Sequence, residues 1–168
     1  LAVDGLLVGA IGVSDPLKEG AREAVADLRA LGFTRVIMLT GDHEHTASRI
    51  AHEAGIDEYR SNMLPEDKHA YVEELRREGC RVVMVGDGIN DSPALSLADV
   101  GVAMAQGTAI AKEVADITLS SGSLQSLVRL RRLSCELMRR LDTSFWQVMA
   151  VNSALLAAGI GGLVTPQV

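Results

Sequence analysis

Short apolar runs alternate with amphipathic stretches between residues 35 and 119 of this chain. Buried strands are expected in the runs rich in Val, Ile, Leu and Met, at 35–39, 81–85, 100–104 and 117–119, with a further short strand near 59–61. Helices are expected in the stretches between them, at 44–54, 65–78, 92–98 and 109–115. Strands that alternate with helices predict right-handed crossovers, and we therefore expect an α/β fold with a parallel sheet.

The segments before and after this region follow different patterns. Asp4-Gly5 lies between two apolar runs, which predicts a hairpin. Pro16 is expected in the first turn of a helix that opens at Ser14-Asp15 and ends at Gly32. From Leu124, apolar residues keep helical spacing while arginines fill the other face, which predicts a long helix that continues into the apolar C-terminal segment.

That C-terminal segment has the composition of a membrane span. No charged residue occurs at 143–168, and residues 145–164 are about as long as a helix that crosses the hydrocarbon core. The arginines before it would then lie on the cytosolic side. We therefore expect three parts: 1–123 as part of a globular domain, 124–142 as a basic linking helix, and 143–168 as a truncated transmembrane helix, with residues 1–142 cytosolic.

Composition adds three restrictions. Hydrophobic residues make up 48% of the chain and aromatic residues only 3%, which predicts an aliphatic core. The net charge of −6 gives no reason to expect a nucleic-acid partner. Cys80 and Cys135 lie far apart without CxxC spacing, so we interpret them as incidental thiols.

Because the chain begins with Leu1 and stops without a polar tail, we expect it to be a fragment of a longer protein.

The richest candidate site follows the apolar run at 82–85. Two aspartates, an asparagine and two glycines replace an ordinary turn in Gly86-Asp87-Gly88-Ile89-Asn90-Asp91. In open α/β sheets, ligands bind beyond the carboxyl ends of the strands. Asp87 and Asp91 are hard oxygen ligands suited to Mg²⁺, and Asn90 can donate to a phosphate oxygen. The loop therefore predicts a magnesium and phosphate site.

Two further segments carry groups of the same chemistry. Thr40 offers a hydroxyl to a phosphate oxygen, and Gly41 allows close approach to the backbone. Lys68 lies one turn into the helix after Pro65 and can bring positive charge to a phosphoryl group. Taken singly, these are compatible with a strand-to-helix turn and a solvated lysine. Together with the aspartate loop they predict phosphoryl transfer, which depends mainly on positioning and charge neutralisation.

The ordered set of segments resembles a known superfamily. Thr40-Gly41-Asp42, residues 65–68 and residues 86–91 are similar to motifs two, three and four of the haloacid-dehalogenase superfamily. A fuller resemblance is to the heavy-metal branch of the P-type cation-transporting ATPases. It rests on the same motifs together with residues 15–18, 38–42, 85–95 and 107–111 and the basic helix that leads into a membrane span. The resemblance covers essentially the whole chain.

The resemblance implies a partial Rossmann-like sheet of the haloacid-dehalogenase type, the second half of a pump's phosphorylation domain, followed by the start of the next transmembrane helix. It implies ATP as substrate and Mg²⁺ as cofactor. The implied site residues are Thr40, Gly41, Asp42, Lys68 and Asn90, with Asp87 and Asp91 as the Mg²⁺ ligands and Asp42 near the nucleotide or the magnesium shell. The implied partners are a transported metal cation, membrane lipid, the first half of the phosphorylation domain, the nucleotide-binding domain and other membrane helices.

One departure from the family pattern limits what the chain can do alone. The phosphorylated aspartate of the pumps lies in an Asp-Lys-Thr-Gly-Thr motif, which does not occur in this sequence. We therefore predict that the chain alone forms no phosphoenzyme. The favoured function is a part of an ATP-driven heavy-metal pump. The alternatives are a soluble haloacid-dehalogenase-like phosphatase and a non-catalytic module that keeps the sheet.

Three polar residues outside these motifs are candidate metal ligands. Asn152 lies within the apolar segment, where it is either a candidate for the transported metal or an amide that packs against another helix. His43 and His45 follow the Thr-Gly-Asp motif, but a spacing of two residues does not place both on one helix face. We do not expect a metal site at the histidines.

Overall fold

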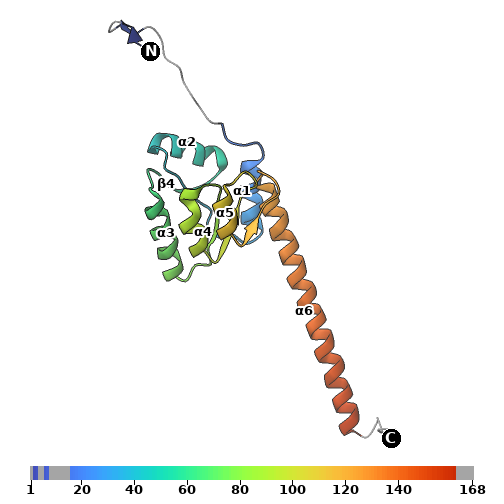
Figure 1. The fold of residues 1–168 in the computed structure, drawn as a ribbon. Helices are drawn as coiled ribbons and strands as arrows, with labels where there is room; N and C mark the ends of the chain where they lie inside the picture. The colour runs from blue at the N-terminus through green and yellow to red at the C-terminus, as the bar shows by residue number, and fades with distance from the viewer. Residues whose placement is uncertain (1, 4–5, 8–15, 162–168) are drawn as a thin grey trace. The chain divides into compact units, whose positions relative to one another are not determined.

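The computed structural model of the chain describes residues 2–3, 6–7 and 16–161 (Figure 1). The elements are, in chain order, β1 (Ala2–Val3), β2 (Leu6–Leu7), α1 (Ala21–Ala30), β3 (Ile37–Leu39), α2 (Glu44–Ala54), β4 (Glu58–Arg60), α3 (Pro65–Arg77), β5 (Val83–Gly86), the 3₁₀ helix η1 (Ile89–Asp91), α4 (Ser92–Leu97), β6 (Val100–Ala103), α5 (Ala109–Val114), β7 (Ile117–Thr118) and α6 (Gln125–Ile160). They fall into two compact units, Leu1–Ser126 and Leu127–Val168.

Five strands of the first unit form two parallel sheets. β3 pairs with β4, with Ile37 opposite Glu58. β5, β6 and β7 form a second sheet in that order, with Val83 opposite Val100. The predicted parallel α/β fold is therefore confirmed. Within the described residues, β3 and β5 each pair with a strand on one side only.

The N-terminal segment departs from the prediction at one point. α1 begins at Ala21, whereas Pro16 lies in an irregular segment before it. Gly20 precedes the helix with φ of 76°, a left-handed conformation that glycine adopts without steric cost. Because this conformation is not helical, α1 does not extend further toward the N-terminus. The hairpin is confirmed by the pairing of β1 with β2. Asp4-Gly5 and Ser14-Asp15 lie outside the described residues.

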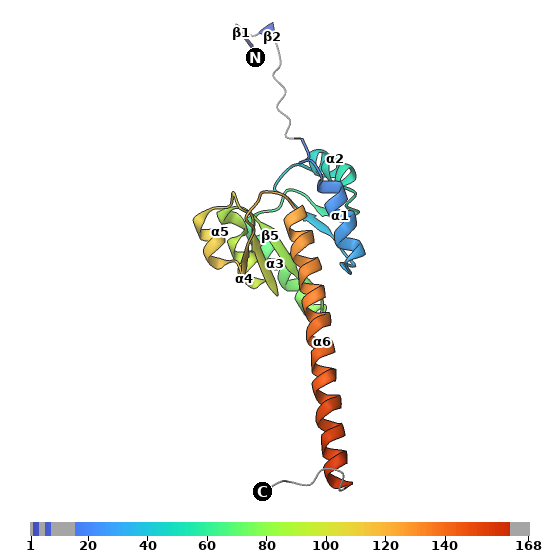
Figure 2. The same cartoon turned by 90° about the vertical axis from the view of Figure 1, so that its right-hand side faces the viewer.

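Small aliphatic side chains form the core of the first unit, as the composition predicts. The most deeply buried are Ala24, Ala47, Ala51, Val72, Ala94, Leu95, Val102, Ala103 and Ala111. α4 lies against α3, β5 and β6 (Figures 1 and 2). A Cβ added at Gly101 of β6 would lie 2.5 Å from the carbonyl oxygen of Leu95 in α4. This close approach requires glycine and fixes α4 beside the sheet.

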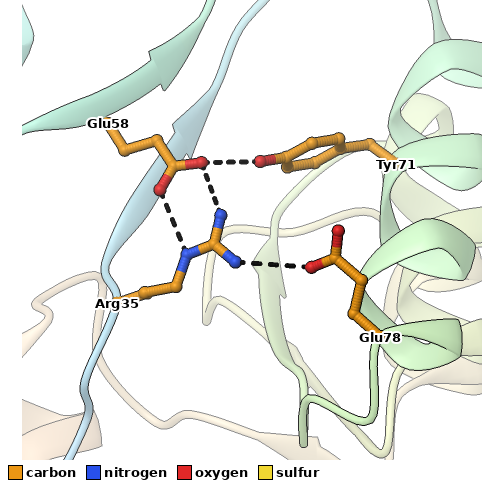
Figure 3. Close-up of polar contacts among 4 residues, drawn as sticks. All are labelled: Arg35, Glu58, Tyr71 and Glu78. Carbon is orange, nitrogen blue, oxygen red and sulfur yellow. Dashed lines mark hydrogen bonds and ion pairs between the residues drawn. The ribbon is translucent and has the colours of Figure 1, made fainter.

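A charged network holds α3 against β3 and β4 (Figure 3). Arg35 donates to both carboxylate oxygens of Glu58, at 3.2 and 2.7 Å, and the Tyr71 hydroxyl donates to the same carboxylate at 2.7 Å. Arg35 also forms an ion pair of 3.6 Å with Glu78, which follows α3. Because Arg35 precedes β3 and Glu58 begins β4, this network lies at the amino ends of the strands.

α6 is a continuous helix of 36 residues. Its side chains beyond Val128 are almost all exposed, including Leu155 and Ile160. Among the described residues it is the one helix that is long and apolar enough to cross a membrane. The predicted long helix is confirmed and runs without a break through residues 142 and 143. The division at 123 and 142 stays a prediction.

Candidate active site

The Thr40–Asp42 turn closes the end of β3. The Thr40 hydroxyl donates to Asp42 Oδ2 at 3.0 Å and accepts from the Asp42 backbone N–H at 3.1 Å. A Cβ added at Gly41 would lie 3.4 Å from the Met63 carbonyl oxygen, so the turn lies close against the segment that leads into α3. The Thr40 hydroxyl, predicted to face a phosphate, is bonded within the turn.

Lys68 reaches the aspartate loop from the first turn of α3. That helix begins after Leu64, whose backbone N–H donates to Asp67 Oδ2 at 2.9 Å, and Pro65 occupies its first turn. Lys68 Nζ donates to Asp91 Oδ1 at 2.8 Å, and the two side chains are only 14% and 13% exposed. A charge pair this close and this shielded from water fixes both groups at the carboxyl end of β5.

Gly86 makes room for the Asp91 carboxylate. A Cβ added there would lie 2.7 Å from Asp91 Cβ, which is closer than side-chain packing allows, and 3.0 Å from its Oδ2. The chain returns over Gly86 because residues 89–91 form a 3₁₀ turn directly before α4. Gly86 is therefore required because the Asp91 side chain passes close to its Cα, whether or not a ligand also approaches the backbone there.

The backbone of Asp87 is supported from a second loop. The Thr108 N–H donates to the Asp87 carbonyl oxygen at 2.9 Å. A Cβ added at Gly107 would lie 3.1 Å from the same oxygen and 2.9 Å from the Met104 carbonyl oxygen. Thr108 also caps α5, since its side chain accepts from the Ala111 N–H at 3.3 Å. The loop after β6 thus fixes the Asp87 backbone while its carboxylate stays exposed.

The predicted site residues meet in two side-chain contacts, Thr40 with Asp42 and Lys68 with Asp91. Asp87 and Asn90 are exposed, and neither has a side-chain partner among the described residues. Asn152 is exposed on α6, in the other unit. Their assigned roles stay predictions.

Sequence reasoning missed a group of polar residues beside the Thr40–Asp42 turn. Glu44 accepts hydrogen bonds from the hydroxyls of Ser61 and Tyr59, and these bonds lower the pKa of its carboxyl. His43 Nδ1 lies 3.0 Å from Asn62 Oδ1. The partners are 15 to 19 residues apart in the sequence, so local spacing carries no signal for them. Thr108, in contrast, lies in one of the segments that carry the family resemblance.

Known proteins resemble this chain in both sequence and structure. The haloacid dehalogenase-like hydrolase family matches residues 1–99, which is more than half of the chain. The chain belongs to this family. A motif set read from three loops therefore identified the haloacid dehalogenase-like fold correctly.

Relatives of this haloacid dehalogenase-like chain include metal pumps. It is 45% identical over 166 residues to a manganese-exporting P-type ATPase of Mycobacterium leprae (strain TN), covering 98% of this chain and 23% of that protein. It is 42% identical to a copper-exporting P-type ATPase of Bacillus subtilis (strain 168), covering 99% of this chain and 21% of that protein. These matches confirm the resemblance to heavy-metal P-type ATPases. The chain spans about a fifth to a quarter of their length.

A solved structure extends the likeness to the fold. The crystal structure of a zinc-transporting PIB-type ATPase in the E2.Pi state matches with a TM-score of 0.82 and 36% sequence identity. The match covers 89% of this chain and 24% of that structure. The relatives are named for manganese, copper and zinc, so the likeness extends over several metals.

Proposed function

We propose that this chain forms the magnesium- and phosphoryl-binding half of the phosphorylation domain in an ATP-driven heavy-metal pump. One observation carries the proposal. The contact of 2.8 Å between Lys68 and Asp91 joins the first turn of α3 to the loop after β5, as a shared phosphoryl site requires. The likeness to named metal pumps over nearly the whole chain supports the same function.

The phosphoryl group would lie between the Thr40–Asp42 turn and the loop after β5. Lys68 supplies positive charge, while Thr40 and Asn90 offer hydrogen-bond donors to phosphoryl oxygens. Gly41 allows the backbone to approach the group, and by resemblance Asp42 contacts the nucleotide or the magnesium shell. Thr40 would exchange its bond to Asp42 for one to the ligand.

Asp87 and Asp91 fit a magnesium ion as two of its ligands. Lys68 donates to Oδ1 of Asp91. The second carboxylate oxygen of Asp91, Oδ2, lies near the glycine backbone of the loop. No group of three or more Asp, Glu, His or Cys side chains is placed to hold a metal within the described residues. Mg²⁺ commonly uses one or two carboxylates and completes its shell with water and phosphate oxygens. When bound, it neutralises phosphate charge.

The two open strand edges support a partner for the sheet. β3 and β5 each pair on one side only among the described residues, and their apolar residues are only half-buried. A parallel strand added between them would end at the same edge as the Thr40 turn and the aspartate loop. We assign this strand to the first half of the phosphorylation domain, with the phosphorylated aspartate at its end.

α6 supports the membrane part of the proposal. It carries arginines at 129–140 and an apolar half beyond residue 143, which is the order expected for a helix that enters the membrane from the cytosol. Residues 1–142 would be cytosolic. Asn152 is the transported-metal candidate within the apolar half, with packing against a neighbouring helix as the other interpretation. Lipid and the remaining membrane helices would surround it.

The test is Asp87→Asn in the complete protein that contains this chain. The change removes an anionic ligand and keeps the size of the side chain, so Mg²⁺-dependent labelling by ATP should slow about a hundredfold. Asp57→Asn is the matched control, because Asp57 is 89% exposed in a surface ion pair with Arg29. It should label at the wild-type rate, and the chain alone should take up no hydroxylamine-sensitive label. Wild-type labelling of Asp87→Asn would reject the role.

A further inference from the structure

Two loops beside the candidate active site are joined along their backbones. The Thr40 N–H donates to the Arg60 carbonyl oxygen at 3.0 Å, and the Met63 N–H donates to the Thr40 carbonyl oxygen at 3.0 Å. The Asn62 N–H donates to the Asp42 carbonyl oxygen at 2.8 Å. The turn that carries Thr40 is therefore tied to the segment that leads into α3.

Side chains reinforce the same junction. The Tyr59 hydroxyl donates a hydrogen bond of 2.6 Å to one oxygen of the Glu44 carboxylate, and the Ser61 hydroxyl donates to the other oxygen. Tyr59 and Ser61 are two residues apart in an extended segment, so their side chains point to the same side. α2, which Glu44 begins, packs against β4 on that side (Figure 1). His43 adds a contact of 3.0 Å between its Nδ1 and Asn62 Oδ1.

Asn62 adopts a strained backbone conformation at the centre of these bonds. Its φ is 52°, the one positive value for a residue other than glycine among those described. A left-handed conformation is disfavoured for an L-residue, although asparagine tolerates it better than most. The bonds to Asp42 and His43 hold Asn62 in place. Its reversal of the chain lets α3 begin at Pro65, so that Lys68 reaches Asp91 from the first turn.

We propose that the side chains of Glu44, Tyr59, Ser61, His43 and Asn62 form a clasp of positioning residues. The clasp fixes the Thr40–Asp42 turn relative to the start of α3, so that Thr40 and Lys68 reach the same phosphoryl group. This role rests on the function proposed above. Reacting groups need placement within roughly 0.5 Å, and a misplacement of 1 Å costs about a hundredfold in rate. The clasp also explains His43, which the metal chemistry leaves without a role.

The experiment compares two tyrosines that make the same kind of bond. Tyr59→Phe removes the hydroxyl that donates to Glu44 at 2.6 Å, and Tyr71→Phe removes one that donates to Glu58 at 2.7 Å, at the far end of the strands. Both are made in the complete protein that contains this chain, together with the double variant Tyr59→Phe/Ser61→Ala. The rate and final amount of phosphoenzyme are measured separately, with labelled ATP at several concentrations.

Tyr59→Phe should lower the maximal rate of phosphoenzyme formation about tenfold and the double variant about a hundredfold. The final amount of label should be unchanged, and the KM for ATP should change less than about twofold, because binding remote from the reacting atoms is kept. Tyr71→Phe should label at the wild-type rate, since both bonds from Arg35 to Glu58 remain. Amide exchange at Asn62 and Met63 should quicken in Tyr59→Phe and in the double variant, but not in Tyr71→Phe.

Three results would overturn the clasp. Wild-type rates in Tyr59→Phe and the double variant would show that the bonds to Glu44 do not position the site, while the proposed function would stand. A lower amount of label at an unchanged rate would show loss of folded protein, which is a structural effect. A wild-type protein that forms no phosphoenzyme at all would reject the proposed function and the clasp with it.

Discussion

The ion pair between Lys68 and Asp91 should stabilise the site far more than an ordinary surface pair. Nζ and Oδ1 are 2.8 Å apart, and the side chains are 14% and 13% exposed. At an effective dielectric constant of about 20, the attraction at this distance is roughly 6 kcal/mol. Loss of water from both charges offsets much of it. A charge-assisted hydrogen bond commonly contributes about 1.5–3 kcal/mol net, and we expect a coupling energy of about 2–3 kcal/mol.

A double-mutant cycle isolates this energy. Lys68→Met, Asp91→Asn and the double variant are compared with the wild type by hydrogen–deuterium exchange of peptides that cover β5 and η1. Lys68→Met leaves the shielded Asp91 carboxylate without its bond, and Asp91→Asn leaves the shielded Lys68 ammonium without its counter-charge. The double variant should therefore be more stable than the sum of the singles predicts. A coupling of about 2–3 kcal/mol corresponds to roughly a 30- to 150-fold discrepancy in the local opening equilibrium.

The matched control lies on the same helix. Arg77 and Glu73 form an ion pair of 2.6 Å whose side chains are 69% and 44% exposed. Solvent screening should reduce the coupling in this second cycle to below about 0.5 kcal/mol. If the Lys68–Asp91 cycle gave a value as small as the control, water would be screening the pair. The reasoning from burial would then be wrong.

Three further outcomes are expected. Gly86→Ala should displace Asp91, because the new Cβ would lie 2.7 Å from Asp91 Cβ. The variant should still fold, but the complete protein should no longer be phosphorylated. Labelling at the wild-type rate would contradict the crowding argument. The Arg35 guanidinium lowers the pKa of Glu58, so stability from this pair is present above the unfolded value near 4.5 and is lost as the pH falls through the folded value. In Arg35→Met, the free energy of unfolding measured in urea should therefore fall less between neutral and acidic pH than it does in the wild type. An unchanged dependence on pH would contradict this role of the pair. A cysteine in place of Leu155, in a background without other cysteines, should resist a membrane-impermeant maleimide added from the cytosolic side, whereas free labelling would exclude a lipid-embedded helix there unless a water-filled pathway reaches it.

The sequence was sufficient for the order of the elements but not for their exact contacts. The alternation of apolar runs and helical stretches predicted the parallel strands, because buried strands and amphipathic helices leave distinct local periods. The start of α1 was wrong, since the left-handed Gly20 ends the helix more decisively than Pro16 begins one. The bond between Lys68 and Asp91 joins residues 23 apart, so it depends on how α3 packs rather than on any local pattern.

The candidate site shows the same limit. Family motifs located Thr40, Asp87 and Asp91, but they did not show that the Thr40 hydroxyl donates to Asp42. The need for glycine at position 86 comes from the close passage of the Asp91 side chain, which the motif alone does not reveal. Such constraints arise from neighbours in space, and a single sequence does not record them.

One edge each of β3 and β5 has no paired strand in the part of the chain that the structure describes, and this affects how the molecule is handled and assembled. Each edge presents backbone N–H and C=O groups beside half-buried apolar side chains, which is the surface on which strands of other chains add. Produced as these 168 residues, the protein should therefore self-associate unless a complementary strand is supplied. A synthetic peptide of that strand would act as an intermolecular chaperone, and its binding could be followed as a gain in solubility without any enzymatic turnover.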